Sequence, residues 1–251
     1  MYAVCSLLGA FAGGLYCSNA AKKRGYDSND MISLLLITAV GILIGGSLLY
    51  FVVSFKNAAA LVPADFKLNS PAKLFAVMQL FFGGQIFYGG LFGGMAAAVI
   101  YIKKKKLPMG DYSDMIAPAI PLFHAFGRVG CFFGGCCYGV ESDIGFIFTH
   151  SPVESANALR RFPVQLLEAA FNLLLFLILC RMLKAGKKNL LRLYLSLYAA
   201  GRFFLEFIRG DTYRGFVFGT LSTSQLISLI ILSAVTVSLI YDRQKRRARY
   251  G

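Results

Sequence analysis

Long apolar segments alternate with short polar segments along the chain. The apolar segments lie at roughly residues 2–21, 31–55, 74–102, 115–135, 162–183, 190–208 and 219–241. Each is longer than a barrel strand and comes close to the about 20 residues that a helix needs to cross a bilayer. Because hydrocarbon offers no partner for unpaired backbone groups, segments of this length must be helical. The pattern predicts an all-α, polytopic membrane protein with seven transmembrane helices, in a single integral membrane domain over residues 1–251.

The composition agrees with a membrane protein. Hydrophobic residues make up 57% of the chain, charged residues make up 15%, and the mean hydropathy is +0.63, which excludes an ordinary soluble domain. The 26 Lys and Arg residues against 12 Asp and Glu residues give a net charge of +14. In a soluble protein such an excess would suggest nucleic-acid binding. Here the cations form short clusters between apolar segments, which is typical of topology signals, so we expect no nucleic-acid partner.

The cationic clusters indicate how the helices are oriented. They follow the first, third, fifth and seventh apolar segments and comprise Lys22, Lys23 and Arg24; Lys103, Lys104, Lys105 and Lys106; Arg181, Lys184, Lys187, Lys188 and Arg192; and Arg243, Lys245, Arg246, Arg247 and Arg249. Since cytoplasmic loops are enriched in Lys and Arg, the N-terminus is predicted to lie outside and the C-terminus in the cytoplasm. The first segment lacks the basic region and the cleavage site of a signal peptide, so we expect a retained helix.

Glycine pairs at a spacing of four residues occur in several apolar segments. They are Gly9 with Gly13, Gly41 with Gly45, Gly89 with Gly93 and Gly90 with Gly94. Such pairs let membrane helices approach closely, so we interpret the first two as packing positions. The glycine-rich run at residues 83–90 also contains a Gln and a Tyr, and so many glycines weaken a helix. Two interpretations of this run remain open: a broken helix that lines a cavity, or close packing.

Charged residues also fall inside the predicted helices. They are Arg128, Glu168, Arg202 and Glu206. Each costs about 2.5 to 3.5 kcal/mol at a helix centre on insertion scales, so each must face protein or water. A buried Arg–Glu pair that only locks helices together explains Arg202 with Glu206. It does not explain Arg128, which has no acidic residue near it in the sequence.

Further polar residues extend these positions into three stripes at helical spacing. The sixth predicted helix carries Tyr194, Tyr198, Arg202, Glu206 and Arg209; the fifth carries Arg161, Gln165, Glu168 and Asn172; and the seventh begins with Ser222 and Gln225. Residues three or four apart share one face of a helix. The predicted topology places the polar ends of these helices toward the outer side, so we expect the stripes to meet in one outward-facing polar cavity.

The segment around Arg128 carries the densest candidate chemistry. The run Gly127, Arg128, Val129, Gly130 combines a guanidinium fork with accessible backbone amides, and this combination suits a phosphate ester. No redox or nucleotide-binding motif is visible in the sequence. An anionic lipid headgroup is therefore the natural occupant of the predicted cavity.

Several motifs together resemble those of the prolipoprotein diacylglyceryl transferase family. The family signature is similar to the segment from Gly127 to Gly139. The other similar motifs are Asp114, Ala117 and Pro118; Pro163, Gln165 and Glu168; Gly201, Arg202, Glu206 and Arg209; Ser222 and Gln225; Tyr88, Gly89 and Gly90; and Tyr2. The resemblance extends over all seven predicted helices.

The resemblance implies an activity and roles for these residues. The activity is transfer of the diacylglyceryl group from phosphatidylglycerol to the lipobox cysteine of a preprolipoprotein signal peptide, releasing glycerol 1-phosphate without a cofactor. Arg128 and Arg202 would hold the phosphate and stabilise its charge. Glu206 and Asp114 would orient these arginines, and a tyrosine or His124 would assist the thiol proton, with Tyr88 as the candidate tyrosine. The other implied substrate-binding residues are Arg209, Gly139, Gln165, Glu168 and Tyr2. The implied location is the bacterial inner (plasma) membrane, as a multi-pass protein.

The chain departs from the family pattern at three places. Cys131 and Tyr88 stand where the family usually has Asn and His, and residues 135–137 replace its common Asn-Gly-Glu. The arginines are unchanged. Two alternatives therefore stay open, a related glycerolipid-group transferase with another acceptor and a non-enzymatic binder or transporter of anionic lipid. The lack of a detectable internal repeat counts against a transporter.

The cysteines allow a further alternative. Cys131, Cys136 and Cys137 with His124 would supply metal-binding side chains, but zinc motifs usually space their ligands in pairs separated by two to four residues. Adjacent Cys136 and Cys137 do not easily bind one ion together. A disulfide near the outer face and unreactive packing cysteines are the other interpretations. The sequence therefore predicts no metal site.

Overall fold

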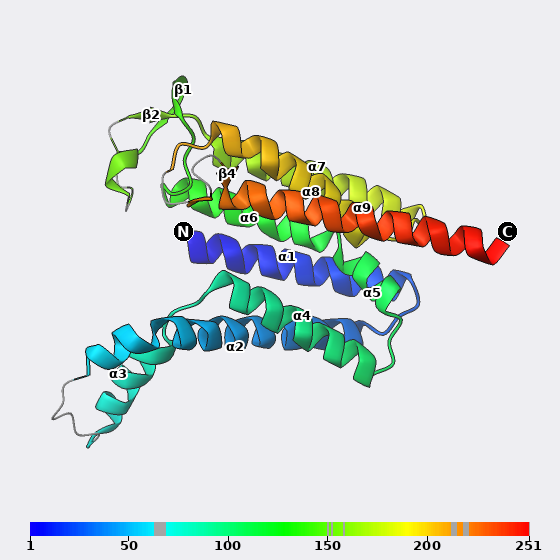
Figure 1. Ribbon diagram of the computed structural model, residues 1–251, viewed down its shortest axis with the longest axis horizontal. Coiled ribbons are helices and arrows are strands. Elements are labelled where there is room, and N and C mark those ends of the chain that lie inside the picture. Colours follow the sequence, from blue (N-terminus) through cyan, green and yellow to red (C-terminus); the bar gives the residue numbers. More distant parts are fainter. Residues whose placement is uncertain are drawn as a thin grey trace. The chain divides into compact units, whose positions relative to one another are not determined.

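The computed structural model describes residues 1–62, 69–149, 151, 153–157, 159–211, 215–217 and 221–250, and most of them are helical (Figure 1). The chain forms two compact units. The first unit consists of Met1–Ala20 and Gly110–Gly251, and the second unit is Ala21–Met109.

Helices build the first unit. They are α1 (Tyr2–Lys23), α5 (Met109–Ile116), α6 (Ala119–Phe133), α7 (Val164–Lys184), α8 (Leu190–Leu205) and α9 (Thr223–Tyr250). The last four run alongside one another (Figure 1). Glycine lets α1 approach α6, because a Cβ added at Gly9 would lie 2.8 Å from the Cβ of Phe126. At Gly13 an added Cβ would lie 3.6 Å from the Cβ of Ala119. The packing role predicted for this pair is confirmed.

An apolar core lies between α7 and α8. Leu175, Leu179 and Leu183 of α7 are buried against Leu190 and Tyr194 of α8. The spacing of four residues puts the three leucines on one face of α7. This contact fixes α8, and with it the polar stripe that α8 carries, against α7.

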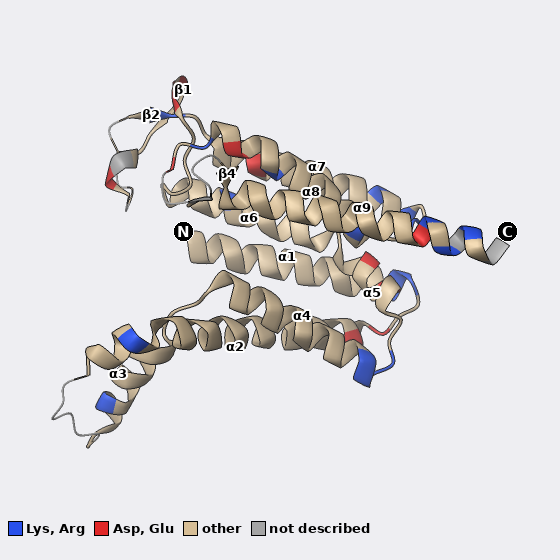
Figure 2. Ribbon diagram, viewed as in Figure 1, with Lys and Arg blue, Asp and Glu red and all other residues tan. Residues whose placement is uncertain are grey.

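Short strands and 3-10 helices collect at one end of the first unit. The strands pair antiparallel, β1 (Glu141–Ile147) with β2 (Arg160–Arg161) and β3 (Phe216–Val217) with β4 (Leu221–Ser222), and the 3-10 helices are η1 (Glu154–Ala156) and η2 (Glu206–Ile208). Lys and Arg residues gather toward the opposite end (Figure 2). There Arg192 Nη1 lies 2.6 Å from Asp242 Oδ2, which links the start of α8 to the C-terminal part of α9. One end of the unit is thus rich in loops and the other is cationic.

The second unit contains α2 (Ser28–Ala60), α3 (Pro71–Phe82) and α4 (Phe87–Lys104). α2 and α4 pack through their glycines: a Cβ added at Gly45 would lie 2.3 Å from the carbonyl oxygen of Gly89. This contact leaves no room for a side chain and confirms the packing role predicted for Gly45. At the cationic end of this unit, Tyr101 donates a hydrogen bond of 3.1 Å to Asp30.

The predicted helix at residues 74–102 is broken. α3 and α4 meet at an angle of 92°, and Gln85 in the break donates a hydrogen bond of 2.6 Å to Ser47 Oγ on α2. The glycine-rich run therefore interrupts the helix, and its later glycines also pack closely against α2. That the break lines a cavity stays a prediction.

The number of membrane-spanning helices is confirmed only in part. Among the described residues, five helices are long and apolar enough to cross a membrane, or six if the bent pair α3 and α4 counts as one span. The segment predicted at 190–208 is a 16-residue α8 followed by η2, and 16 residues reach only about 24 Å. The predicted start of the last helix at 219–220 lies outside the described residues. Seven spans and the predicted orientation stay predictions.

Candidate active site

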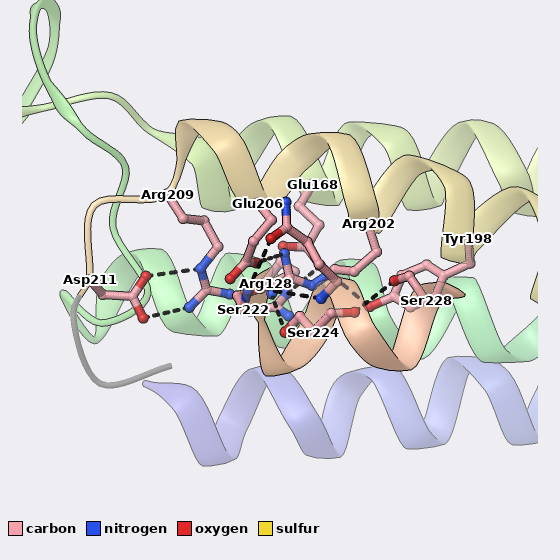
Figure 3. Close-up of polar contacts among 11 residues, drawn as sticks. Arg128, Glu168, Tyr198, Arg202, Glu206, Arg209, Asp211, Ser222, Ser224 and Ser228 are labelled. Atoms are coloured by element: carbon pink, nitrogen blue, oxygen red, sulfur yellow. Dashed lines mark hydrogen bonds and ion pairs between the residues drawn. The ribbon is translucent and has the colours of Figure 1, made fainter. Parts of the chain in front are cut away.

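Arg128, which is partly buried, pairs with the buried Glu168 and joins α6 to α7. Arg128 Nε lies 3.0 Å from Glu168 Oε1, and the glutamate side chain is 2% exposed. Tyr198 of α8 donates a 3.4 Å hydrogen bond to the same carboxylate oxygen (Figure 3). Arg128 thus has an acidic partner after all, supplied by another helix. Its positive charge is held in place at the meeting point of three helices.

Arg202 and Glu206 form the pair expected from their spacing of four residues. Arg202 Nη1 lies 2.6 Å from Glu206 Oε2, and Arg202 Nη2 donates a 3.0 Å hydrogen bond to Ser224 Oγ on α9. Both residues are buried. The α-helix ends at Leu205, and Glu206 begins η2. The guanidinium is therefore oriented by two elements, one of them α9.

Arg209 follows η2 and binds Asp211 with two parallel hydrogen bonds. Arg209 Nε and Nη2 donate to Asp211 Oδ1 and Oδ2 at 2.9 and 2.6 Å (Figure 3). Burial disfavours the guanidinium charge, but the hydrogen bond and the charge of Asp211 outweigh it and raise the pKa of Arg209 above its usual value. Asp211 was not among the residues predicted for the site, although an acidic residue two positions after an arginine was a visible signal.

These six residues, Arg128, Glu168, Arg202, Glu206, Arg209 and Asp211, are called the arginine cluster below. Its three guanidinium groups are matched by three carboxylates. Buried charges need such partners, because an unpaired charge costs several kcal/mol in a medium of low polarity. The polar stripes of α7 and α8 and the start of α9 thus meet in the first unit, as the spacing predicted.

Gln165 of α7 and Gln225 of α9 are further buried polar residues of the first unit. Gln165 Nε2 donates a 2.9 Å hydrogen bond to the carbonyl of Cys136. The other side-chain atom of Gln165, Oε1, is buried and has no hydrogen-bond partner among the described residues. Gln225 Oε1 accepts a 3.0 Å hydrogen bond from the backbone of Ser222 and caps α9. An open buried acceptor at Gln165 suits a ligand that donates a hydrogen bond, such as a hydroxyl group.

His124 lies one helical turn before Arg128 on α6. Tyr194 Oη and His124 Nδ1 are 3.0 Å apart, and the ring centroids of His124 and Tyr198 are 5.2 Å apart. The histidine therefore contacts the tyrosine stripe of α8. Tyr198 also contacts Glu168, so this stripe extends from His124 to the arginine cluster.

Asp114 does not lie with the arginines, contrary to the role implied for it. Its Oδ1 accepts a 2.7 Å hydrogen bond from the backbone of Leu190, and its Oδ2 accepts one of 3.2 Å from Asn189. These amides begin α8, about 18 Å along the helix from Arg202. Free amides at a helix start favour a carboxylate. Asp114 is therefore placed as a cap for α8.

Gly139 occupies a crowded backbone crossing. It forms an antiparallel bridge with Arg209, and a Cβ added there would lie 2.5 Å from the carbonyl oxygen of Phe162. The neighbouring Tyr138 is buried beneath the guanidinium of Arg161, which lies 5.0 Å from the ring centroid. Close backbone approach explains the glycine, and substrate binding by Gly139 stays a prediction.

The two tyrosines with predicted substrate roles lie at helix starts. Tyr2 begins α1 in the first unit and is 55% exposed. Its Cα would lie 3.2 Å from a Cβ added at Gly130, so the start of α1 packs against α6 close to Arg128. Tyr88 lies in the first turn of α4 in the second unit and is 40% exposed. The roles of both tyrosines stay predictions.

Cys131, Cys136 and Cys137, called the thiol cluster below, lie together. Their Sγ atoms are all within 4.8 Å of one another, so the sulfurs of the adjacent Cys136 and Cys137 lie close together. All six cysteines are free thiols, and the disulfide interpretation has no support. His124 does not belong to this group.

Comparisons with known proteins agree on one family. The family model described as "Prolipoprotein diacylglyceryl transferase" matches residues 1–241. A phosphatidylglycerol–prolipoprotein diacylglyceryl transferase of Clostridium tetani is 34% identical over 92% of this chain and 88% of the relative. A similarly named protein of Clostridium perfringens is 32% identical over 96% of this chain and 90% of the relative. A protein of Geobacter sulfurreducens with that name is 31% identical over 97% of this chain and 91% of the relative.

Proposed function

Because the chain belongs to the prolipoprotein diacylglyceryl transferase family, we propose that it transfers the diacylglyceryl group of phosphatidylglycerol to the cysteine thiol of a prolipoprotein. The observation that carries the proposal is the arginine cluster, in which Arg128 and Arg202 are each held by a buried carboxylate. A phosphodiester headgroup is the ligand that two oriented guanidinium forks suit best.

The reaction explains why paired arginines are needed. The acceptor sulfur forms a bond to the terminal glyceryl carbon, and the bond from that carbon to the phosphate oxygen breaks. The phosphodiester carries one negative charge, and the leaving glycerol 1-phosphate carries a second on the released oxygen. The thiol proton leaves to a base. Groups that bind the developing charge more tightly than the starting ester accelerate the step, and Arg128 and Arg202 supply such groups.

The arginines are prepared before the lipid binds. Glu168, Glu206 and Asp211 balance their charges, so the cluster is stable without substrate. When a phosphate enters, each guanidinium still has donors that its carboxylate does not use, since Arg carries five N–H groups. Glu206 thus orients Arg202. Glu168 orients Arg128, which is the role that had been expected of Asp114.

The acceptor thiol must lose its proton, because a free cysteine has a pKa near about 8.5 and only the thiolate attacks. We propose His124 or Tyr88 as the group that assists. The support for His124 is its contact with Tyr194 and its position one turn from Arg128 on α6. The support for Tyr88 is its place in the family motif alone.

We propose that the acceptor is the lipobox segment of a preprolipoprotein and that no nucleic acid is bound. The protein would lie in the bacterial inner (plasma) membrane with seven spans, the N-terminus outside and the C-terminus cytoplasmic. Two features support this orientation. One is the cationic end of the first unit (Figure 2). The other is that Arg209 and Asp211 of the arginine cluster follow η2, at the loop-rich end of the unit.

The proposal is tested with purified protein, phosphatidylglycerol vesicles and a lipobox peptide. Mass spectrometry should find the peptide heavier by one diacylglyceryl group. A matched peptide with Ser in place of its Cys should stay unmodified. Modification of the serine peptide at a similar rate would point to a different acceptor, and lipid binding with no modified peptide would favour a binder or transporter.

A further inference from the structure

The thiol cluster lies just past the point where α6 ends. Cys131 is in the last turn of α6, and the chain then turns back at Gly134 and Gly135, the latter with φ +66°. Cys136 donates a backbone hydrogen bond of 3.2 Å to the carbonyl of Cys131. The turn brings the next two cysteines over the helix end. The three sulfurs therefore meet because the backbone folds back, and not because the residues are adjacent.

The backbone around these sulfurs is held in an unusual conformation. Cys137 has φ +56°, the left-handed region that residues other than glycine rarely adopt. Gln165 of α7 holds Cys136, the residue before Cys137, by donating a 2.9 Å hydrogen bond to its carbonyl oxygen. Such backbone strain is concentrated at functional sites. A cysteine that only fills space would not require it.

The thiol cluster offers three sulfur ligands at close range, because its Sγ atoms all lie within 4.8 Å of one another. The thiolate is the form that binds metals, and a thiol releases its proton when the metal binds.

We propose that Cys131, Cys136 and Cys137 form a binding site for a soft, thiolate-preferring metal ion, Zn²⁺ or Cu⁺. At a metal–sulfur bond of about 2.3 Å, tetrahedral ligands lie about 3.8 Å apart, and sulfurs that are already within 4.8 Å of one another reach this spacing by small side-chain rotations. Thiolates select Zn²⁺ and Cu⁺ over hard ions such as Mg²⁺.

The charges of such a site are balanced. Three metal–sulfur bonds form, and each thiol that is still protonated releases its proton to solvent. A divalent ion with three thiolates carries one net negative charge, which the nearby Arg128 and Arg209 offset. A fourth position on the ion stays open, as in zinc sites with three protein ligands and one water.

This site uses other side chains than the ion pairs of the proposed transferase site. None of the three thiols is among the carboxylate and hydroxyl partners of the arginine cluster. Cys131→Asn introduces the residue that the family usually carries at this position. We therefore expect this variant to keep its transferase activity while it loses metal binding, so failure of one proposal is distinguishable from failure of the other.

The test uses the purified full-length protein in detergent, reduced and stripped of metal. Zn²⁺ is titrated in competition with a coloured chelator, Cu⁺ is titrated likewise without oxygen, and Mg²⁺ serves as the hard-ion control. We expect one equivalent of Zn²⁺ or Cu⁺ to bind. Cys131→Asn, Cys136→Ser and Cys137→Ser should each weaken binding about 100-fold or more, and Cys180→Ser on α7 should not weaken it.

Cobalt gives a second measurement that reports the ligands directly. Co²⁺ in place of Zn²⁺ should show sulfur-to-metal charge-transfer absorption, which each variant of the thiol cluster weakens. The proposal is wrong if the wild-type protein binds neither Zn²⁺ nor Cu⁺ with defined stoichiometry, or if Cys180→Ser removes binding equally. It is also wrong if Cys131→Asn, with unchanged thermal unfolding, keeps full affinity.

Discussion

Arg128 and Glu168 illustrate what single residues contribute to this protein. The two charges lie 3.0 Å apart, with Glu168 buried and Arg128 partly buried. Removing the arginine leaves the buried carboxylate uncompensated, which costs about 3 to 5 kcal/mol for a fully buried pair and less for this partly exposed one. Such a pair is costly for a protein that needs only stability, since apolar residues of similar volume often do as well. An arginine at this position is explained if the site must stabilise the negative charge that develops on a leaving phosphate.

Replacing Arg128 by Gln should lower the rate of glycerol 1-phosphate release about 100-fold or more, as is typical when one donor to a developing charge is removed. Arg128→Lys should fail similarly, because an ammonium group does not reproduce the planar fork. Arg181→Gln, at an exposed position in the last turn of α7, is the matched control and should leave the rate unchanged.

A double variant separates chemistry from folding. Arg128→Gln with Glu168→Gln removes both charges, so the thermal unfolding temperature should recover relative to the single variant Arg128→Gln while the rate of glycerol 1-phosphate release stays low.

Cys136→Ser and Cys137→Ser should lower the rate of turnover only slightly. If these cysteine variants abolish turnover in folded protein and Arg128→Gln does not, thiol or metal chemistry replaces the arginine mechanism.

The sequence predicted some of these contacts and not others for a physical reason. Arg202 with Glu206 was predictable, because residues four apart along a helix are neighbours on its surface. Arg128 with Glu168 was not, since the two are 40 residues apart and their contact depends on how α6 packs on α7. Asp114 was assigned to the arginines through its motif, but its side chain caps α8 instead.

At the level of elements, close helix approach through glycine organises the second unit. Gly41 and Gly45 of α2 meet Gly93 and Gly89 of α4 with backbone against backbone. The spacing predicted a packing role for Gly41 and Gly45, whereas close packing was one of two interpretations left open for the glycine-rich run at residues 83–90. The angle of 92° between α3 and α4 was not predictable, because it depends on the hydrogen bonds that Gln85 finds on α2. The end of α8 at Leu205 was likewise not predictable, because it falls inside a continuous apolar segment.

Gly45→Ala should destabilise the protein by about 1 to 3 kcal/mol, the usual cost of an overfilled contact, because the new methyl group would lie 2.3 Å from a backbone oxygen. Gly14→Ala is the control, since nothing lies within 4 Å of a Cβ added there. Thermal unfolding in detergent compares the two. Equal unfolding temperatures for both variants would contradict the packing of α2 on α4.

At the level of the whole molecule, the distribution of charge is the basis of the predicted orientation. Cationic clusters follow alternate apolar segments, and in the first unit Lys and Arg gather away from the loop-rich end (Figure 2). The pattern predicted a mostly helical membrane protein, which the structure confirms. The division into two compact units was not predicted, because no linker or change in composition marks it.

The predicted topology is checked by reporter fusions after Lys106 and after Tyr250. Both should report a cytoplasmic position, since both sites follow a cationic cluster. A fusion after Asn69, which follows the second apolar segment, should report the outer side. An external signal at either of the first two sites would reverse the orientation and move the arginine cluster to the cytoplasmic side.

The central claim is that a thiol attacks a phospholipid whose leaving phosphate the arginine cluster stabilises. Its most direct test is the release of glycerol 1-phosphate from phosphatidylglycerol, measured with and without a lipobox peptide. The account predicts release only when the cysteine peptide is present, in a one-to-one ratio with lipidated peptide. Steady release without any thiol acceptor would show a lipase-like hydrolysis and contradict the account.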